Sequence, residues 1–500
     1  MGMLQEGLRN MAELKVSPYA PTLIESMRSV GYSLQSAIAD IIDNSISAGA
    51  KSVSIRYSPY DEPYIAILDD GNGMEPAELT QAMRHGSRDP WGIRADNDLG
   101  RFGLGLKTAS LSQCRRLTVV SLKNNTTAAR CWDIDLVVQR EDWILYVPEP
   151  DEIENLPLFK ALQKQGHGTL VIWQQLDRLC AGESSIERAL PEKMDAVREH
   201  LALVFHRYLS PEGATNRLKI SLNENPVMPV DPFLSNHTAI QPLPDESIEI
   251  EDQQVLIKPY ILPHISKLTP SDLRQAGGEE GLRRYQGFYI YRNRRLIIWG
   301  TWFRLTRQEE LSKLARVRVD IPTALDHLWT IDIKKSTAHP PEEVRQNLRR
   351  IIEKIVGTSR RVYTYRGRST HSDKLVHSWT RLEDREGISY IINRTHPLVS
   401  AFTDRLCVED RKLFNLVLET LERTYPADAL YADMASERPR IYLEENLEGK
   451  LFELAQCLLT AADAVEGGRG RLLERLICLE PFCQYPDITE SIVKELINAG

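Results

Sequence analysis

The sequence predicts an α+β protein: a first domain of helices and an antiparallel sheet, a second α/β domain, and a mostly helical C-terminal region. Three observations support this prediction. The chain has 500 residues, which is more than one ordinary core organises. Helical and strand-like patterns are mixed in the first part, and strand-like runs dominate the middle. Helical spacing prevails at the end, so we place the domains at 1–215, 216–370 and 371–500.

The composition is that of a globular protein without a membrane segment. Apolar residues make up 42% of the chain and charged residues 26%. No apolar run approaches the roughly 20 residues that a bilayer crossing needs, and the first residues lack the apolar core of a signal peptide. Seven scattered cysteines favour a reducing compartment and disfavour a structural zinc site. We therefore expect a cytoplasmic protein with no membrane partner, and the net charge of -8 does not by itself indicate nucleic-acid binding.

A single helix is expected over residues 33–49, SLQSAIADIIDNSISAG. Ser33 is suited to cap its start and Gly49 to end it. Apolar residues recur at helical spacing along one face, namely Leu34, Ile38, Ile41, Ile42 and Ile46. Asp40 and Asn44 lie one turn apart and therefore on the same side. A polar stripe that faces solvent would explain this pair, and so would a site that holds a metal and activates a water.

The other elements of the first domain follow in order. A short helix at 22–31 comes first, strands at 53–58 and 64–70 follow the helix at 33–49, and a further helix starts near Pro76. Residues 84–105 have little apolar periodicity, so we expect a long loop of the kind that often carries function. A helix, four strands of one antiparallel sheet and a last helix are then expected at 106–114, 117–124, 129–136, 143–147, 169–176 and 190–208.

The second domain is expected to begin with a strand and to continue with strands and one helix. The strands are expected at 218–223, 255–262, 287–300, 315–322 and 330–336, and the helix at 341–356. Residues 360–373 are interpreted as a linker. Helical spacing returns in the C-terminal region at 413–425 and 447–465.

A turn directly after the strand at 64–70 has the pattern D-x-G-x-G, from Asp69 through Gly71 and Gly73 to Met74. An aspartate at a strand end can accept a hydrogen bond from an exocyclic amino group. Glycines permit positive φ and let a flat ring approach the backbone. An ordinary β-turn would also use these residue types.

Two further signals contain glycines. The run from Gly100 to Thr108, GRFGLGLKT, places three glycines before a helix, where bare N–H groups can cradle phosphates and Lys107 adds a charge. The spacing is neither that of a Walker loop nor that of a dinucleotide fingerprint, and a glycine-rich hinge without ligand is the alternative. The fourth signal, Gly166-His167-Gly168-Thr169, leads into a strand.

Together the four signals resemble the GHKL ATPase superfamily, which includes gyrase B, the ninety-kilodalton heat-shock chaperone, histidine kinases and MutL. The resemblance covers about residues 20–175 and depends on all four motifs occurring in this order. It implies a Bergerat-type α/β sandwich in residues 1–215 that binds ATP and Mg²⁺ as its cofactors, and an ATPase activity.

The resemblance also implies roles for individual residues. Asn44 would hold Mg²⁺, Asp40 would be the catalytic carboxylate, and Asp69 would bind the adenine amino group. Thr169 would assist through water, and the glycines and lysine of the 100–108 run would form a lid over the phosphates. The implied nucleotide-binding set is Asn44, Asp69, Gly71, Gly73, Met74, Gly100, Gly103, Leu104, Gly105, Lys107, Thr108 and Thr169.

The family usually has Glu where this chain has Asp40. Aspartate is one methylene shorter, and a general base needs hydrogen-bond reach to the attacking water. We therefore expect slow hydrolysis, and a nucleotide-binding module that does not hydrolyse ATP is an alternative. Asp43 is less suited as the base, because it points about 100° away from Asn44 around the helix.

The second domain resembles the transducer domain of MutL-like and MORC-like members, in which a lysine on a strand reaches the γ-phosphate. Lys335 or Lys334 is the candidate, and since alternate strand residues face opposite ways we prefer Lys335. This domain argues against a histidine kinase. The opening at 17–50 is closest to MORC-like ATPases, including bacterial relatives associated with restriction-like defence. The resemblance implies a homodimer that ATP closes into a clamp on DNA or a partner, including defence-system proteins, with a clamp on polypeptide as the rival interpretation.

The segment 283–318 contains ten Lys or Arg residues against two Glu, interleaved with aromatic residues. Such a pattern is typical of a nucleic-acid-facing patch. A sheet face whose aromatic residues point inward is the alternative. From the basic and aromatic pattern we expect DNA as a partner of this segment.

Overall fold

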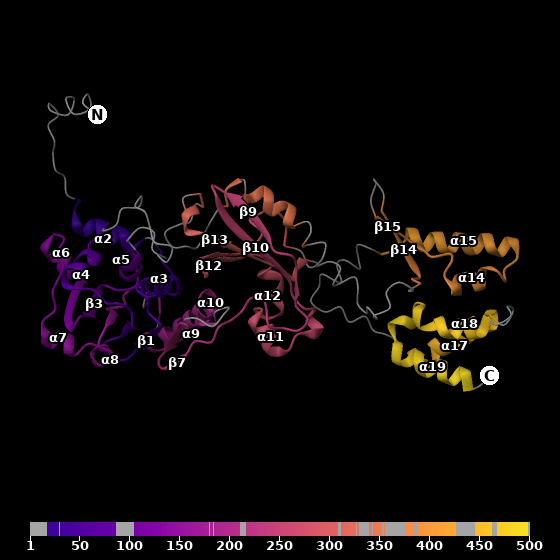
Figure 1. Ribbon diagram of the computed structural model, residues 1–500, viewed down its shortest axis with the longest axis horizontal. Helices are drawn as coiled ribbons and strands as arrows, with labels where there is room; N and C mark the ends of the chain where they lie inside the picture. The colour runs from indigo at the N-terminus through magenta and orange to yellow at the C-terminus, as the bar shows by residue number, and fades with distance from the viewer. Residues whose placement is uncertain are drawn as a thin grey trace, which may run out of the picture. The chain divides into compact units, whose positions relative to one another are not determined.

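The computed structural model describes residues 18–29, 31–86, 105–179, 181–183, 185–210, 217–308, 312–326, 328–329, 340–342, 344–352, 355, 376–383, 388–426, 446–462 and 468–498. The chain divides into two units, Met1–Arg360 and Arg361–Gly500 (Figure 1). The first unit contains all the described residues of the site that the sequence predicts.

Helix α3 (Leu34–Ser47) is the expected apolar helix, and its boundaries follow from its caps. The Ser33 hydroxyl accepts a hydrogen bond from the Ser36 amide at 3.2 Å, and Gly49 beyond the C-terminus has a φ of +79°. Asp40 and Asp43 are both buried, so the interpretation of a solvent-facing polar stripe is wrong for them. Of Asp40, Asp43 and Asn44, only Asn44 is exposed.

The first sheet has seven strands in the order β4-β3-β5-β2-β1-β6-β7. All neighbouring pairs are antiparallel except β1 and β6, which are parallel. The strands are β1 (Ser52–Ser58), β2 (Tyr64–Asp69), β3 (Arg116–Lys123), β4 (Thr126–Asp133), β5 (Gly168–Gln174), β6 (Lys219–Leu222) and β7 (Asn225–Pro226).

Two strand predictions for this sheet are wrong, and the strand expected at 129–136 ends earlier, at Asp133, where a helix (Ile134–Arg140) begins. The strand that we expected to open the second domain is β6, and it pairs with β1 because the chain returns to the first sheet after its last helix. Residues 143–147 form no strand, since only Tyr146 makes an isolated bridge, to Cys131. The boundaries near 215 and 370 stay predictions.

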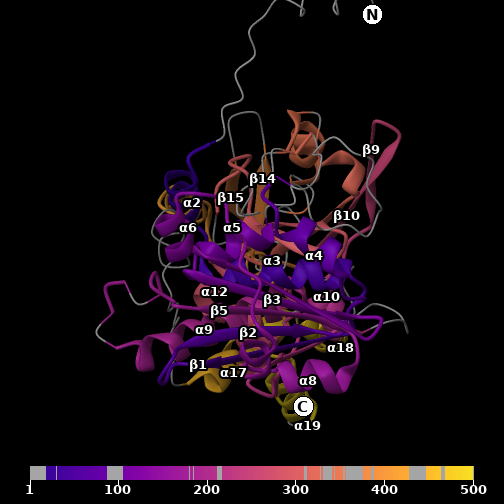
Figure 2. The same cartoon turned by 90° about the vertical axis from the view of Figure 1, so that its left-hand side faces the viewer.

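Helices cover both faces of the first sheet, as Figure 2 shows with α2 to α5 above the strands and α8 below them. The larger core contains residues of α3, of β1 and β2, and of the long helix α9. A smaller core on the other face includes Phe159 and Leu162 of α8. The remaining helices of this part are α2 (Ala20–Arg28), α4 (Pro76–Met83), α5 (Gly105–Leu111), α6 (Ile134–Arg140), α7 (Pro150–Glu154), α8 (Phe159–Gln165), α9 (Ile186–Val204) and α10 (His206–Leu209).

The second sheet has six strands, with the path β12-β11-β13-β10-β8 and β9 paired to β10. The alternation of buried residues along β10 matches the period of two that a half-covered strand requires. The elements are β8 (Gln241–Pro242), β9 (Glu246–Ile250), β10 (Gln253–Ile261), α11 (Pro270–Gln275), α12 (Gly278–Arg284), β11 (Gly287–Arg292), β12 (Arg295–Thr301) and β13 (Ala315–Ile321). Residues 344–352 are helical, as expected, whereas the strand expected at 330–336 lies outside the described residues.

The two sheets share one hydrophobic core. Tyr289, Tyr291 and Leu296 of the second sheet belong to the same cluster as the buried residues of α3 and α9. The Tyr291 hydroxyl is 2.7 Å from His206 Nε2, so the second sheet is also fixed to α10 by a buried hydrogen bond.

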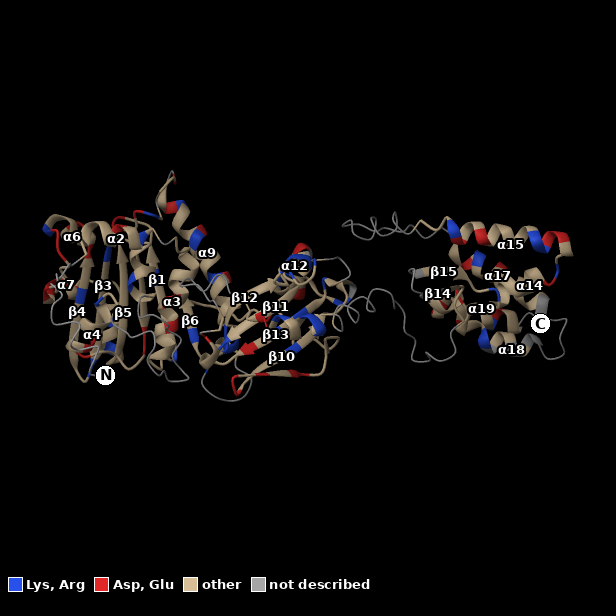
Figure 3. Ribbon diagram, turned by 90° about the horizontal axis from the view of Figure 1, so that it is seen from above, with Lys and Arg blue, Asp and Glu red and all other residues tan. Residues whose placement is uncertain are grey.

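The basic segment 283–318 is only partly a surface. Figure 3 shows blue stretches on α12 and β13, but four of the ten basic residues are buried, namely Arg292, Arg295, Arg316 and Arg318. Phe288, Tyr289, Tyr291 and Trp302 are buried as well. The expectation of one continuous nucleic-acid-facing patch is therefore wrong for these residues, because strands β11 to β13 turn them into the core. Exposed basic side chains remain at 283, 284, 294, 304 and 307.

The second unit contains a hairpin and a group of helices. Its own core includes Leu451, Leu458, Phe482 and Ile492. The elements are β14 (Trp379–Glu383), β15 (Ile388–Ile392), α14 (Pro397–Thr403), α15 (Val408–Arg423), α17 (Leu447–Ala462), α18 (Gly468–Arg475) and α19 (Pro486–Asn498). Over the described ranges of the chain, no helix has the length and apolar character needed to cross a membrane.

We predict different stability effects at two glycines of the turn that enters β5. Gly166 and Gly168 both have positive φ. A Cβ at Gly168 would lie 2.1 Å from the Asp69 carbonyl oxygen, whereas a Cβ at Gly166 would have no atom within 4 Å. Gly166→Ala should cost about 1 kcal/mol, and Gly168→Ala at least about 2 kcal/mol more. Urea unfolding of both variants measures the difference, and equal costs would contradict the close approach of β5 to β2.

Candidate functional site

The centre of the site is the carboxylate of Asp69, at the end of β2. In the sheet register Asp69 is paired with Thr169 of β5, and its side chain is 6% exposed. Its Oδ1 accepts hydrogen bonds from the amides of Gly71 (2.9 Å) and Thr169 (3.2 Å). Its Oδ2 accepts a hydrogen bond from the Ser45 hydroxyl of α3 at 2.8 Å. Three separate elements therefore orient this carboxylate.

Burial raises the pKa of Asp69, and the three hydrogen bonds oppose that rise. A carboxylate offers about four acceptor positions, and the three donors leave room for one more. The site can therefore accept a further hydrogen bond from a ligand donor, such as an amino group.

The turn after β2 is packed too tightly for side chains at its glycines. A Cβ at Gly71 would lie 2.9 Å from Ala48 Cβ, and one at Gly73, where φ is +67°, would lie 2.3 Å from the Leu122 carbonyl oxygen. The amide of Met74 then donates to the Ser121 hydroxyl at 2.8 Å. The predicted D-x-G-x-G turn thus lies between α3 and β3, and its glycines are required by packing.

A second layer of hydrogen bonds supports this turn. The Ser121 and Thr169 hydroxyl oxygens are 3.1 Å apart, and Gln165 Nε2 donates to the Asp69 carbonyl oxygen at 2.7 Å. His167 Nδ1 lies 3.0 Å from the Gly71 carbonyl oxygen. The predicted residues Asp69, Gly71, Gly73, Met74 and Thr169 are therefore brought together in one place.

Asp40 and Asn44 lie on α3, the helix that also carries Ser45. The Tyr32 hydroxyl donates to Asp40 Oδ2 at 3.2 Å. A Cβ built on Gly105, the first described residue after 86, would lie 3.8 Å from that same oxygen. The start of α5 therefore approaches Asp40.

The lid residues are only partly described. Gly100, Gly103 and Leu104 lie outside the described residues, whereas Gly105, Lys107 and Thr108 begin α5. Lys107 is buried, and its Nζ donates to the Ala82 carbonyl oxygen at 2.8 Å. A role of Lys107 and Thr108 in phosphate binding stays a prediction. Lys334 and Lys335 also lie outside the described residues.

An arginine of the second sheet reaches the helix that carries Asp40. Arg295 Nε lies 2.8 Å from Asp43 Oδ1, and its Nη2 lies 3.9 Å from Asp40 Oδ1. All three side chains are 4% exposed or less. The second sheet is thus joined to α3 by a buried ion pair.

Local patterns did not reveal several residues of this site. Ser45 and Ser121 are small polar residues on otherwise apolar elements, a type that is also common where nothing binds. Tyr32 and Arg295 reach α3 from outside it, and no spacing in the sequence indicates that. Gly168 did carry a signal, because it belongs to the fourth motif.

Comparison with known proteins identifies the class of the domain. Residues 32–169 match the family model described as "Histidine kinase-, DNA gyrase B-, and HSP90-like ATPase". This range includes α3, the turn after β2 and Thr169. Residues 32–169 are therefore similar to the ATPase domains of the GHKL superfamily, and the fold is of the Bergerat type that the resemblance implied.

The curated relatives are mismatch repair proteins. "Mismatch repair endonuclease pms1" of Dictyostelium discoideum is 34% identical over 107 residues, 20% of this chain and 10% of the relative. MutL of Colwellia psychrerythraea is 34% identical over 134 residues, 25% of this chain and 20% of the relative. MutL of Thermoanaerobacter sp. (strain X514) is 32% identical over 96 residues, 19% of this chain and 15% of the relative. The MutL-like resemblance is confirmed, and the MORC-like one stays a prediction.

The likeness to these relatives is confined to a segment, since the matches span no more than a fifth of their length. A solved structure, described as the crystal structure of the N-terminal domain of a DNA repair protein, matches at 15% identity and a TM-score of 0.41. That match covers 68% of this chain and 98% of the other.

We predict that Asp69→Asn changes the pH dependence of stability. A raised pKa means that folding favours the protonated acid. The contribution of Asp69 to stability is therefore present below the ordinary carboxyl pKa and is lost as pH rises through the pKa of the folded protein. Asparagine does not titrate. The stability of the wild type relative to Asp69→Asn should therefore fall as the pH rises above the ordinary aspartate value of 3.8, measured as the free energy of unfolding in urea. Glu62→Gln, at an exposed position, is the control, and a difference that rises with pH would contradict the assignment.

We also predict strong energetic coupling between Arg295 and Asp43. Arg295→Met should cost about 3 kcal/mol, because it removes the cation from a buried carboxylate. In the double variant with Asp43→Asn, the losses should fall short of additivity by about 1–3 kcal/mol. The exposed pair Arg56–Glu224, at 2.7 Å, is the matched control and should show less than about 1 kcal/mol of coupling. Additive losses at Arg295 and Asp43 would contradict a buried ion pair.

Proposed function

We propose that the protein binds ATP at the turn after β2 and hydrolyses it slowly in a Mg²⁺-dependent reaction. The observation that carries this proposal is the buried Asp69 carboxylate, which three donors orient and which has room for one more. The adenine amino group is a donor of the required kind. The match of residues 32–169 to an ATPase family model supports the same assignment.

Asn44 fits the role of holding Mg²⁺. It is exposed on α3, one turn beyond Asp40, so its amide oxygen is accessible to a metal that also binds phosphates. Mg²⁺ in nucleotide sites is usually held by one or two side chains together with phosphates and waters. When bound, the metal would neutralise charge on the transferring phosphoryl group.

Asp40 is the proposed general base. Its Oδ2 accepts a hydrogen bond from Tyr32, which fixes the side chain, while Oδ1 faces Arg295 at 3.9 Å. A fixed carboxylate is suited to orient a water and to take its proton. Because aspartate is short, a slow reaction that serves a conformational switch is the expected outcome.

We further propose an ATP-gated homodimeric clamp that acts in DNA metabolism. The names of the MutL and pms1 relatives, which refer to mismatch repair, support DNA as the partner. Lys335 would reach the γ-phosphate, and the Arg295–Asp43 pair already connects the second sheet to the helix of the base. The exposed arginines at 283, 284, 294, 304 and 307 are the residues of the basic segment available to DNA. A defence-system partner remains an expectation from the MORC-like resemblance.

A cytoplasmic location is part of the same proposal. Six described cysteines carry unpaired thiols, namely Cys114, Cys131, Cys407, Cys457, Cys478 and Cys483. Free thiols persist in reducing compartments.

Two variants should separate hydrolysis from binding. Asp40→Ala should lower the rate of phosphate release at least about 100-fold and leave the affinity for a non-hydrolysable ATP analogue unchanged, because the base does not hold the adenine. Asp69→Asn should weaken analogue binding at least about tenfold, because it puts an amide donor opposite the amino group. Phosphate release and calorimetric titration with Mg²⁺ present measure both effects.

Glu62→Gln serves as the control for these measurements and should behave like the wild type. Normal hydrolysis by Asp40→Ala would show that another group is the base. Unchanged analogue binding by Asp69→Asn would contradict the proposed adenine site, and a wild-type chain that ignores ATP would contradict the whole proposal.

A further inference from the structure

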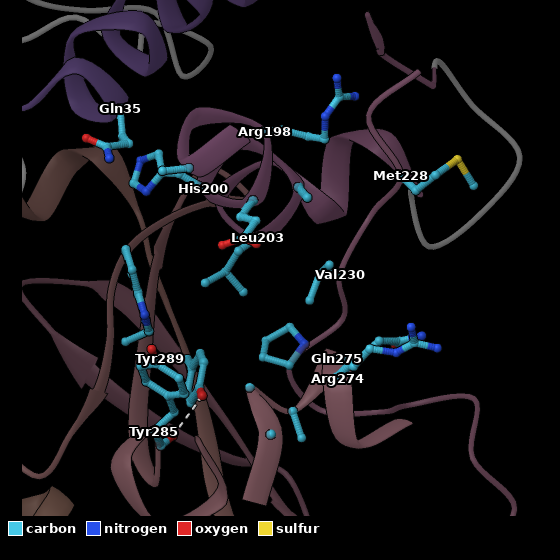
Figure 4. A pocket seen from close by; sticks show the side chains of 18 of the residues that line it. Gln35, Arg198, His200, Leu203, Met228, Val230, Arg274, Gln275, Tyr285 and Tyr289 are labelled. Carbon is cyan, nitrogen blue, oxygen red and sulfur yellow. Dashed lines mark hydrogen bonds between the residues drawn. The ribbon is translucent and has the colours of Figure 1, made fainter. Parts of the chain in front are cut away.

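A second cavity, of about 1210 Å³, lies in the first unit, and no residue of the Asp69 hydrogen-bond network lines it. Its walls come from the start of α3, from α9, from the chain after β7, from the turn between α11 and α12, and from the second sheet. Figure 4 shows Leu203 and Val230 on one side of the cavity and Tyr285 and Tyr289 on another. The cavity is thus separate from the Asp69 network, although Arg295 lines it and also approaches Asp40.

Arg316, on β13, lines this cavity and is only 1% exposed. Its guanidinium contacts the Tyr289 hydroxyl and lies 3.4 Å and 3.5 Å from the carbonyl oxygens of Ala276 and Gly281. Its Nε has no hydrogen-bond partner, and no carboxylate of the described residues forms an ion pair with it. The described groups that accept from Arg316 are therefore all formally neutral.

The tyrosine next to Arg316 does not supply a negative charge. Burial raises the pKa of Tyr289, although the Arg316 guanidinium opposes the rise. The Tyr289 hydroxyl also donates to the Tyr285 carbonyl oxygen at 2.8 Å, the dashed line in Figure 4. Tyr289 is consequently a neutral phenol at neutral pH.

The nearby acidic groups whose side chains the structure describes are occupied or exposed. The carboxylate of Asp231 accepts hydrogen bonds from the Phe233 amide at 3.0 Å and from the Ser235 amide at 2.7 Å. Glu199 lines the cavity but is exposed on α9. Since Arg198, Arg274 and Arg295 also line it, basic residues outnumber acidic ones in the cavity wall.

The other buried arginines of the second sheet each have a carboxylate partner, which Arg316 lacks among the described residues. Arg292 pairs with Asp326 at 2.6 Å, Arg295 with Asp43 at 2.8 Å, and Arg318 with Asp320 at 2.7 Å. A buried charge is strongly disfavoured unless an opposite charge and hydrogen bonds compensate it. Arg316 departs from this pattern where β13 lines the cavity.

We propose that this cavity binds an anionic small molecule whose oxyanion pairs with Arg316. The planar guanidinium fork suits both phosphate and carboxylate groups. The body of the ligand would be flat or apolar, because Leu203, Val230, Tyr285 and Trp299 supply the surface around it. The inference does not depend on the proposed ATP site.

Three probes test the proposal by calorimetric titration of the full chain: phenyl phosphate, benzoate and phenol. They share one phenyl ring and differ in the group attached to it, which is anionic in phenyl phosphate and benzoate and neutral in phenol. Phenyl phosphate or benzoate should bind at least tenfold more tightly than phenol, and the tighter of the two identifies the headgroup. Equal binding of all three, or no binding, would overturn the proposal. Repeating the titration with Asp69→Asn excludes binding at the proposed adenine site, because that variant leaves the second cavity intact.

Arg316→Met should lower the affinity for the anionic probe at least tenfold, whereas Arg283→Met should not, since Arg283 is exposed on α12 and does not line the cavity. The melting temperature of ligand-free Arg316→Met should equal or exceed that of the wild type, because an uncompensated charge has been removed. A lower melting temperature with unchanged probe affinity would make Arg316 merely structural. A wild-type crystal soaked with the probe decides the case independently of any variant: density beside Arg316 supports the proposal, and density only elsewhere overturns it.

Discussion

The structure of the site depends on one constraint, the burial of an ionisable side chain at the end of β2. Asp69 loses its water, and its oxygens must find donors within the protein. The donors come from α3, from the turn after β2 and from β5. Helix, turn and strand must therefore keep fixed positions relative to one another. The two close approaches at Gly73 and Gly168 follow from this, since side chains there would separate the elements.

A second constraint of the same kind joins the two sheets. The carboxylates of Asp40 and Asp43 are buried on α3, and the guanidinium that faces them comes from β12. The helix that carries the proposed base and metal ligand is thus completed by a residue about 250 positions later in the chain. Movement of the second sheet would directly displace or strain α3, which is the kind of coupling that a nucleotide-dependent switch requires.

The sequence predicted the parts of the fold that local patterns determine. The capped helix with Asp40 and Asn44, the turn at Gly71 and Gly73 and most of the longer strands were identified from spacing and residue type, whereas β7, β8 and β9 were not predicted. Contacts between distant segments were not predictable in this way. The pairing of β6 with β1, the burial of Arg292 and Arg295, and the hydrogen bond from Tyr32 to Asp40 all depend on where the chain returns in space. A run of arginines looks the same in sequence whether its partners are solvent or buried carboxylates.

The return of β6 to the first sheet has a consequence for how this fold can be divided. A fragment that ended at residue 215 would lack β6 and β7, and β1 would become an open edge with unpaired amide and carbonyl groups. Such an edge invites aggregation through intermolecular strand addition. Recombination between related genes would for the same reason have to cut beyond residue 226 to move the first sheet intact. The segment joined after the cut would still have to supply a cation for Asp43.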